Sequence, residues 1–463
     1  MKKVLLLNPP GKKLYIRDYF CSKVSQADYI HHPIDLVILS GILSQEFDIT
    51  VIDSIACSLS AEETAHRIEK MRPNIIISLI GSVSLEEDTV FLADIKRRLP
   101  GITIVGIGDV FCENAEKFLK MNSFLDAILL DFTTDDIVRY LQGDIEKVRN
   151  MLFKDTEGHV HQAPAAHVPF FALPVPRHEL FSEFNYRHPF VRTRRFATTI
   201  IDYGCPFKCS FCIMKMLGYK FRSVENVVLE LKYIRSLGIK EILFDTQTFG
   251  ANKRTAMELC HAIVGEKINI GWVCFSRVDV TSYELLDAMK KAGCHTIIFG
   301  VESGSDEILA KYHKGYRSRQ ILETIDYCHS IGIETVGTFI LGLPDESRKT
   351  ASQTLDLIKK IKLDYASFNV AVPRAGTELR TQALKLGFIK NDFVIMDQSG
   401  STIALPTKFL SRDEVLSFRR KAVFSFYLRP SYIMNKLFKI RSYYDITRHF
   451  KHAYWLVKNT WFS

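Results

Sequence analysis

Short apolar runs alternate with amphipathic stretches along residues 1–145. Runs such as KVLLLN and NIIISLI have the continuous apolar character of strands buried on both faces, whereas AEETAHRIEKMR has the periodicity of an amphipathic helix. About five such strands, each followed by a helix, predict a parallel sheet with crossover connections. The loops after the strands are then expected at one edge of the sheet, where doubly wound domains bind their ligands.

The alternation stops over residues 146–195, which gather Pro and His. We expect an ordered but irregular linker there. Three histidines of this stretch, His159, His161 and His167, invite a metal assignment. Nothing in the pattern fixes them on one rigid element, so a linker role is favoured.

The strand and helix pattern resumes at Phe196 and runs through six steps, from FATTIID to YASFNVAV. Six steps are fewer than the eight of a closed barrel, so an open partial (βα)₆ barrel is expected over residues 196–385. Residues 386–463 read as a helical region rich in basic and aromatic side chains. The predicted fold class is therefore α/β, with a doubly wound domain at 1–145, a linker at 146–195, the barrel and this final helical region.

Composition and charge narrow the class of protein. The chain has 463 residues, 47% of them apolar, which is enough to build well-buried cores. No apolar run approaches the roughly 20 residues that cross a bilayer, and the first run, VLLL, breaks at Pro9 and Pro10. We expect a cytoplasmic protein. The net charge is +9, and much of the surplus lies from Lys408 onward, where a basic and aromatic region predicts a helical cap or peripheral membrane contact.

The ten cysteines do not form the dense framework of a secreted disulfide protein, so a reducing compartment is expected. Four of them lie in apolar stretches and are predicted to be packed core thiols: Cys260, Cys274, Cys294 and Cys328. Only one group is closely spaced. It is the triplet Cys205-x3-Cys209-x2-Cys212, within DYGCPFKCSFCIMK.

Three kinds of site could use this triplet. A structural zinc site needs four ligands, and the chain has no second CxxC or CxxH. A redox pair formed by Cys209 and Cys212 leaves Cys205 without a role. Three thiolates on one loop suit a [4Fe–4S] cluster whose fourth iron stays open for a small molecule.

At this point the sequence resembles the radical S-adenosylmethionine (radical SAM) superfamily, whose signature is CxxxCxxC with an aromatic residue, here Phe211, before the last cysteine. The resemblance implies that Cys205, Cys209 and Cys212 hold the cluster and carry the initiating step. It also implies that the open iron binds S-adenosylmethionine, which is cleaved to a 5′-deoxyadenosyl radical. The cofactors then supply the difficult chemistry and the protein positions them.

Other strand ends resemble the same superfamily in order: FDTQTFG, SRVDV, FGVESGSDEIL with KGY, GTFILGLPDE and VPRAGTEL. The resemblance implies contacts with S-adenosylmethionine at each end. Asp245 or Gln247 would meet its amino group, and Arg277 its carboxylate or ribose. The further implied contacts are Glu302 and Ser303 at the ribose or carboxylate, and Gly342 and Pro344 beneath the adenine.

The first domain, opening with VLLLNPP, resembles the cobalamin-binding subclass of this superfamily. The small residues of SLIGS and VGIGD would let the nucleotide tail of cobalamin approach the backbone. The DxHxxG loop that supplies a cobalt ligand in many cobalamin proteins is missing, and His31 and His32 are expected in a turn or capping role before the helix at Pro33. The implied cobalamin-binding residues are Ser78, Gly81, Gly106 and Gly108.

The FYLRP segment at 426–430 resembles the branch containing anaerobic magnesium-protoporphyrin monomethyl ester cyclase, P-methylases and hopanoid methylases. This implies cobalamin-dependent methylation of an unactivated carbon or phosphorus of a large, often apolar substrate. Radical oxidative cyclisation or rearrangement without methyl transfer is the first alternative, and a non-catalytic iron–sulfur protein the second. Expected partners are a small-molecule or lipid-like substrate and an electron donor such as flavodoxin or ferredoxin. The sequence has no compact basic stripe with interleaved aromatic residues near the cysteine loop, so nucleic-acid binding is not expected.

Overall fold

The computed structural model describes residues 1–25, 28–165, 168–390 and 404–438. Contacts divide the chain into two compact units. The first comprises Met1–Ser25, Ile30–Tyr203 and Gly218–Glu241, and the second Gln26–Tyr29, Gly204–Leu217 and Ile242–Ser463. Within the described ranges, no helix is both long enough and apolar enough to span a bilayer.

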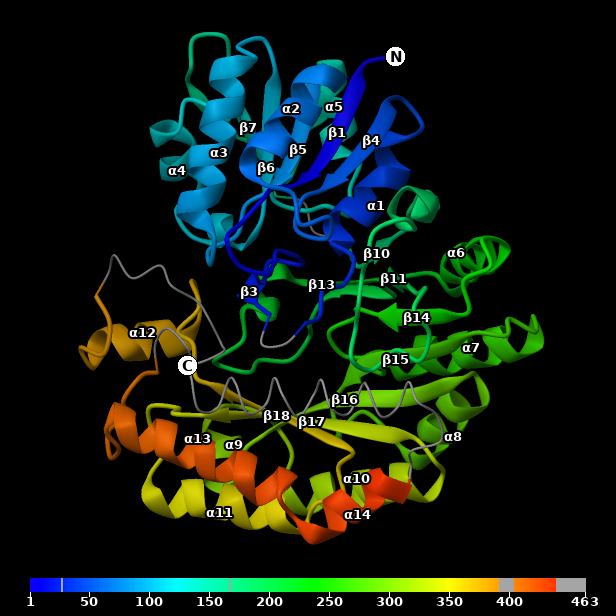
Figure 1. Cartoon of the computed structure of the whole chain (residues 1–463), viewed down its shortest axis with the longest axis vertical. Helices are drawn as coiled ribbons and strands as arrows, with labels where there is room; N and C mark the ends of the chain where they lie inside the picture. The colour runs from blue at the N-terminus through cyan, green and yellow to red at the C-terminus, as the bar shows by residue number, and fades with distance from the viewer. Residues whose placement is uncertain (26–27, 166–167, 391–403, 439–463) are drawn as a thin grey trace. The chain divides into compact units, whose positions relative to one another are not determined.

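The first unit is built around a sheet whose strand order is β4-β1-β5-β6-β7-β8-β9. The first five of these pair in parallel, in the order of a doubly wound fold of the flavodoxin type. Helices flank this sheet (Figure 1). The strands are β1 (Lys3–Asn8), β4 (Asp48–Asp53), β5 (Ile75–Leu79), β6 (Thr103–Ile107) and β7 (Ala127–Leu129), and the helices are α1 (Ile34–Leu43), α2 (Ala61–Met71), α3 (Leu85–Arg98), α4 (Ala115–Met121) and α5 (Asp136–Gln142).

The stretch expected to be an irregular linker contributes two further strands to this sheet. β8 (Met151–Lys154) pairs antiparallel with β7, and β9 (Val160–Gln162) pairs antiparallel with β8. Only four and three residues long, these strands are too short to show a period in the sequence. His161 lies on β9, where its ring nitrogen is 2.7 Å from a carboxylate oxygen of Asp155. His167 lies outside the described residues.

Later segments also belong to the first unit. β10 (Phe170–Phe171) pairs with β13 (Tyr219–Arg222). The other elements here are β11 (Ala197–Thr199), α6 (Val224–Ser236) and β12 (Asp202–Gly204), whose last residue already belongs to the second unit. A buried charge pair stabilises this part, because Glu230 of α6 accepts a 2.6 Å hydrogen bond from Arg222 and lies 2.9 Å from His178. A short hairpin, β2 (Tyr15–Ile16) with β3 (Lys23–Val24), follows β1.

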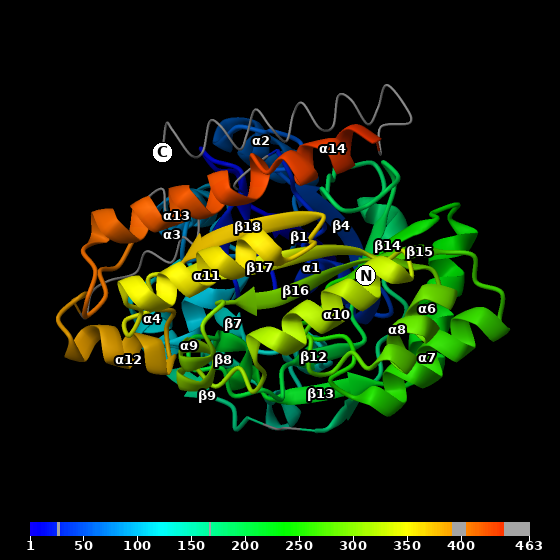
Figure 2. The same ribbon diagram turned by 90° about the horizontal axis from the view of Figure 1, so that it is seen from below.

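The strands and helices of the barrel alternate along the chain as expected, in six steps that begin with β11 and α6. In the second unit β15, β16, β17 and β18 pair in parallel in chain order. Figure 2 shows α10 and α11 on the outer side of these strands. The bounds are β14 (Glu241–Phe244), α7 (Lys253–Gly265), β15 (Gly271–Ser276), α8 (Tyr283–Lys291), β16 (Cys294–Glu302), α9 (Asp306–Lys311), α10 (Ser318–Ser330), β17 (Glu334–Leu341), α11 (Arg348–Lys360), β18 (Tyr365–Val370) and α12 (Glu378–Lys385).

Polar caps start several barrel helices where the loops leave the strands. Asn252, Ser282 and Ser347 each accept a hydrogen bond from a backbone N–H of the first turn of α7, α8 and α11. Packed apolar side chains fill the interior behind them. The four cysteines predicted to be core thiols are confirmed as such, since each is at most 1% exposed: Cys260, Cys274, Cys294 and Cys328.

The described part of the final region is helical, as expected, with α13 (Arg412–Tyr427) and α14 (Pro430–Phe438). α13 packs along α11 and β18. Its start is fixed by a capping box between Ser411 and Glu414. Most of the basic and aromatic segment for which membrane contact was expected, residues 439–463, lies outside the described residues.

Candidate functional site

The three closely spaced cysteines lie on one loop of the second unit, directly after β12. Cys209 is buried, whereas Cys205 and Cys212 are half-buried. Backbone hydrogen bonds hold the loop, since the Cys212 N–H donates to Cys209 O at 3.1 Å and the Ser210 N–H to Tyr312 O at 3.3 Å. The Leu379 N–H, from the start of α12, donates to Ser210 O at 3.0 Å. The loop is thus fixed by two segments far apart in the sequence.

The donor set of this loop fits an iron–sulfur cluster better than a single ion. None of the three cysteines forms a disulfide bond in the part of the chain that the structure describes. Within the described part of the chain, they do not form a group of ligand atoms that all lie within 4.8 Å of one another, as a single bound ion requires. A cube of four irons is wider and takes thiolates from its corners.

Two of the cysteine sulfurs contact polar side chains on neighbouring strand ends. The Arg277 guanidinium, just after β15, donates to Cys209 Sγ at 3.3 Å. Thr248 Oγ1, after β14, lies 3.6 Å from Cys205 Sγ. The sequence reasoning missed Thr248, although FDTQTFG was singled out, because a threonine in a loop carries no signal of its own.

Arg277 is held by its neighbours on every side. Its Nε and NH2 groups donate to the two carboxylate oxygens of Asp279, at 2.9 and 2.8 Å, and NH2 also donates to Lys314 O. Its guanidinium lies 3.9 Å from the ring centroid of Phe207. Burial lowers the pKa of Arg277, but hydrogen bonding and attraction to Asp279 outweigh this, so that the pKa is raised and the charge is retained.

Glu302 ends β16 in a left-handed conformation, with φ of 62°, at a shift in the strand register. Its Oε1 accepts a hydrogen bond from Lys314 Nζ at 3.0 Å. Burial lowers the pKa of Lys314, but the Glu302 charge more than compensates and raises it. Lys314 also lies 5.9 Å from the Phe211 ring, which packs half-buried against Tyr312 and Leu343. This buried ion pair was not foreseen, although KGY was noted.

The other strand-end residues expected to contact S-adenosylmethionine differ in burial and in hydrogen-bond partners. Asp245 is buried and Gln247 half-buried, both directly after β14. Ser303 is fully buried, and its hydroxyl lies 3.1 Å from Thr354 Oγ1 of α11, so its contacts are with the protein. The Ser305 N–H also donates to this hydroxyl, at 3.1 Å.

The loop after β17 is covered by the first turn of α13 and by the segment that precedes this helix. Gly342 has φ of 83°, and a Cβ there would lie 2.8 Å from Val415 Cγ1, so glycine is required. The Lys408 N–H donates to Pro344 O at 2.8 Å, and Lys408 Nζ to Asp345 at 2.6 Å. The adjacent Glu346 is buried, which raises its pKa to about 7 although the Gly342 N–H donates to its carboxylate.

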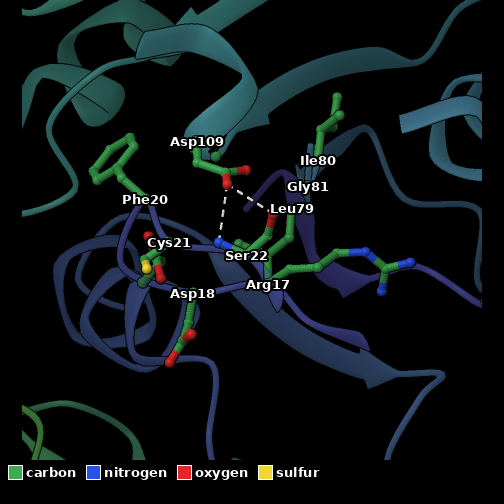
Figure 3. A pocket seen from close by; sticks show the side chains of 11 residues that line it. Arg17, Asp18, Phe20, Cys21, Ser22, Leu79, Ile80, Gly81 and Asp109 are labelled. Atoms are coloured by element: carbon green, nitrogen blue, oxygen red, sulfur yellow. Dashed lines mark hydrogen bonds between the residues drawn. The ribbon is translucent and has the colours of Figure 1, made fainter. Parts of the chain in front are cut away.

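In the first unit, the edge after the parallel strands is closed by the β2–β3 hairpin. Arg17 of the hairpin donates to Asp88, Ser84 and Asn8 in a buried network. Ser22 donates through both its N–H and its hydroxyl to Asp109, as Figure 3 shows. The cavity left between the hairpin and the strand ends is about 10 Å³, room for one water.

The four residues expected to bind cobalamin lie at this edge. Gly108, with φ of 152°, touches the chain so closely that a Cβ would lie 2.0 Å from Ile80 O. A Cβ at Gly81 would meet Arg17 and Ser22 at 3.1 Å, and one at Gly106 would meet Phe111 at 2.9 Å. The Ser78 hydroxyl donates to Leu79 O. The small residues are present, but in this conformation side chains occupy the space in front of Gly81 and Gly106, and the Ile80 backbone occupies the space in front of Gly108.

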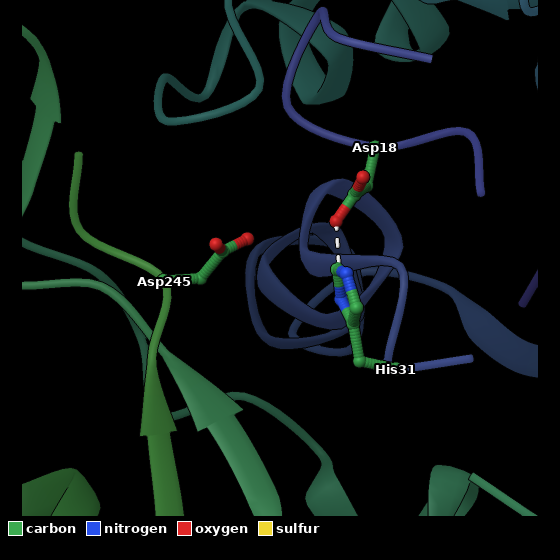
Figure 4. A group of neighbouring side chains, drawn as sticks. All are labelled: Asp18, His31 and Asp245. Carbon is green, nitrogen blue, oxygen red and sulfur yellow. Dashed lines mark ion pairs between the residues drawn. The ribbon is translucent and has the colours of Figure 1, made fainter. Parts of the chain in front are cut away.

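His31 and His32 do not cap α1, whose N-cap is Pro33 with no side-chain hydrogen bond. Both are buried. His31 Nδ1 lies 3.3 Å from an oxygen of Asp18 (Figure 4), yet burial, assisted by Lys23, lowers the pKa of His31 to about 3, so the ring is neutral at pH 7. The His32 ring packs 4.1 Å from that of Tyr186. Asp245, drawn in the same figure, belongs to the second unit.

The chain has clear similarity to known proteins. The family described as the radical SAM superfamily matches residues 199–358. An uncharacterized methyltransferase of Pyrococcus horikoshii is 29% identical over 424 residues, which are 88% of this chain and 90% of the relative. The anaerobic magnesium-protoporphyrin IX monomethyl ester cyclase of Cereibacter sphaeroides is 24% identical over 407 residues, 83% of this chain and 64% of the relative.

A solved structure extends the likeness to the fold of the whole chain. The cobalamin-dependent S-adenosylmethionine radical enzyme OxsB, with aqua-cobalamin and S-adenosylmethionine bound, matches with a TM-score of 0.72. The match covers 99% of this chain and 71% of OxsB at 16% identity, and so concerns the fold. Residues 199–358 form a radical SAM domain, and the protein is a radical SAM enzyme. Membership of this superfamily implies a [4Fe–4S] cluster and S-adenosylmethionine as cofactors.

Proposed function

We propose that this protein is a cobalamin-dependent radical SAM methyltransferase that methylates an unactivated carbon, or phosphorus, of a large substrate. The observation that carries the proposal is the continuous match with the Pyrococcus methyltransferase, which spans both units rather than the radical SAM domain alone. A doubly wound unit ahead of a radical SAM domain is also the fold of OxsB, which binds cobalamin.

In this proposal Cys205, Cys209 and Cys212 hold the cluster, and the strand-end residues Asp245, Gln247 and Glu302 bind S-adenosylmethionine. Glu302 is supported for that role by its position, since Lys314 orients its carboxylate at the end of β16. Ser303 receives less support, because its hydroxyl is used by Thr354 and the Ser305 N–H. Cobalamin would carry the transferred methyl group.

Cobalamin binding at the edge of the first unit requires the β2–β3 hairpin to move. A nucleotide tail cannot enter a cavity of about 10 Å³, and Arg17 and Ser22 stand directly over Gly81. We therefore propose that the hairpin swings away from Gly81 when cobalamin binds, and that the Phe111 ring, which covers Gly106, moves as well. Gly81 and Gly106 then offer backbone surface that no side chain obstructs.

A second candidate is radical oxidative cyclisation without methyl transfer, which the similarity to the protoporphyrin ester cyclase over 83% of the chain favours. Iron and cobalt contents of protein purified without oxygen and supplied with cobalamin test the two. The protein is then incubated with reductant and S-adenosylmethionine carrying a trideuteriomethyl group, and the extracted corrinoid is weighed by mass spectrometry. Stoichiometric cobalt and a labelled corrinoid support the methyltransferase. Four irons without cobalt, together with 5′-deoxyadenosine, would leave radical cyclisation or rearrangement.

A one-electron donor such as flavodoxin or ferredoxin is proposed as the source of reducing equivalents. The Cys209→Ala variant is the control for the formation of 5′-deoxyadenosine, because Cys209 is the buried and central cysteine of the loop.

A further inference from the structure

We propose that Arg277 acts on the iron–sulfur cluster through Cys209 and raises its reduction potential, rather than binding S-adenosylmethionine as its place in the superfamily pattern suggested. The proposal rests on the cluster that the radical SAM domain implies, and not on cobalamin or methyl transfer. Its basis is the 3.3 Å hydrogen bond from the guanidinium to the sulfur of the buried cysteine.

The orientation of Arg277 leaves little of its side chain for another ligand. Four hydrogen bonds, two to Asp279 and one each to Lys314 O and Cys209 Sγ, use four of its five N–H groups. The Phe207 ring covers one face of the guanidinium, 3.9 Å away. Arg277 is 5% exposed. Its guanidinium is therefore enclosed by the cysteine loop on one side and by Asp279 and Lys314 on the other sides.

A cation in this place favours the reduced cluster. Reduction adds one electron and takes a [4Fe–4S] cluster from the 2+ to the 1+ state, with no bond formed or broken and no proton moved; the electron comes from the one-electron donor that radical SAM enzymes use. An N–H donated to a ligand sulfur, and the full positive charge behind it, stabilise the added negative charge. Cys209 is 6% exposed, so water screens the interaction little.

The Asp279 carboxylate holds the Arg277 side chain in position, but its negative charge opposes the effect of the guanidinium on the reduction potential of the cluster. Its carboxylate pairs with Arg277 at 2.8 Å and offsets part of the guanidinium charge. Replacing it by asparagine keeps an oxygen acceptor but removes the negative charge. Arg277→Gln and Asp279→Asn should therefore move the reduction potential of the cluster in opposite directions.

The test is a potentiometric titration of the reconstituted full-length protein, followed by electron paramagnetic resonance, without S-adenosylmethionine or cobalamin. At the wild-type midpoint, Arg277→Gln should show about a tenfold lower ratio of reduced to oxidised cluster, equivalent to a shift of about 59 mV to more negative potential. Asp279→Asn should raise that ratio. Arg254→Gln is the matched control, because Arg254 is an exposed arginine of the same unit and should leave the midpoint unchanged.

Iron content and S-adenosylmethionine affinity separate the proposal from its competitors. An Arg277→Gln protein with four irons, an unchanged midpoint and weakened S-adenosylmethionine binding would show that Arg277 serves the substrate and would overturn the proposal. If Arg277→Gln fails to hold the cluster, Asp279→Asn decides: a midpoint that is unchanged or more negative overturns the proposal. Absence of cobalt or methyl transfer would affect only the proposed function, since this titration uses neither.

Discussion

Charged side chains at the strand ends of the second unit are buried and matched by partners from other loops. Lys314 and Glu302, both buried, pair across 12 positions of sequence, and the buried Asp345 pairs with the exposed Lys408 across 63. Removing Lys314 would leave Glu302 as an uncompensated buried charge, which costs far more than the pair contributes. These side chains therefore hold their loops in one arrangement, and the predictions at the scale of single residues concern this enclosed polar environment.

The first prediction concerns the cysteine loop. Cys209→Ala should abolish iron binding and formation of 5′-deoxyadenosine, because two thiolates cannot retain the cluster, while the melting temperature of the apoprotein changes little. The measurement is iron per chain together with the nucleoside product. Cys57→Ala, at an exposed position, is the matched control and should keep both. An active Cys209→Ala protein would contradict the cluster assignment.

The second prediction concerns the buried carboxyl group of Glu346. Its folded-state pKa of about 7 lies above the ordinary value of 4.5, because the carboxyl is buried. The folded state therefore binds this proton more tightly than the unfolded state does. The free energy of unfolding consequently falls as pH rises from about 4.5 to 7. Glu346→Gln should remove this loss, giving a gain of at most about 3 kcal/mol at pH 8 and little at pH 4.5.

Urea unfolding of the apoprotein at the two pH values measures the effect. Gln keeps an oxygen that can accept from the Gly342 N–H. Glu307→Gln, at an exposed position of α9, should show no such dependence on pH. A gain in stability that is equal at both pH values would contradict the explanation.

At the scale of elements, the β2–β3 hairpin shows how a short, weakly patterned segment can be fixed by one side chain. The hairpin has only two residues in each strand, too few to be stable alone. Arg17 joins it to the strand ends through Asp88, with side chains 1% and 0% exposed. The closed edge of the first unit therefore depends on this ion pair.

Arg17→Met should lower the free energy of unfolding by about 3–5 kcal/mol, because Asp88 is left buried without its partner. The measurement is urea denaturation of the apoprotein. Arg97→Met removes a guanidinium that is 75% exposed and paired with Asp94, and should cost less than about 1 kcal/mol. Similar losses in the two variants would mean that the hairpin is not fixed by Arg17.

The sequence predicts the elements that have a clear hydrophobic pattern. It does not predict the short strands, whose hydrophobic pattern is weak. The buried runs KVLLLN and NIIISLI became β1 and β5, because a parallel strand covered on both faces must be apolar throughout. β8 and β9, of four and three residues, were assigned to a linker. Their pairing is decided by the exposed edge of β7, which the local sequence does not reveal.

At the scale of the whole molecule, the compact units do not follow the expected order of domains along the chain. The first unit takes Gly218–Glu241, which was expected in the barrel. Within this unit Lys220 pairs with Asp131, and Glu230 with His178. Both pairs are buried or nearly so, and both join residues that lie 50 or more positions apart in the chain.

A fragment ending at residue 195 should therefore fail to fold cooperatively, because it lacks β13 and α6 and so deprives Asp131 of Lys220 and His178 of Glu230. A fragment ending at residue 241 contains every segment of the first unit and should melt cooperatively. Circular dichroism on heating compares the two. A cooperative transition of equal midpoint in the shorter fragment would show that residues 1–195 are an independent domain.

The sequence by itself determined the class of fold and the loop that carries three closely spaced cysteines. Apolar period and strand length are local properties, and the spacing of Cys205, Cys209 and Cys212 places three thiols on one loop whatever surrounds it. Tertiary structure decided the partners of those thiols. Arg277 meets Cys209, and Thr248 meets Cys205, because the loops after β15 and β14 lie beside the cysteine loop, which follows β12 of another sheet. Which side chain then points at which sulfur depends on packing across 43 to 68 positions of the chain, and no local pattern encodes it.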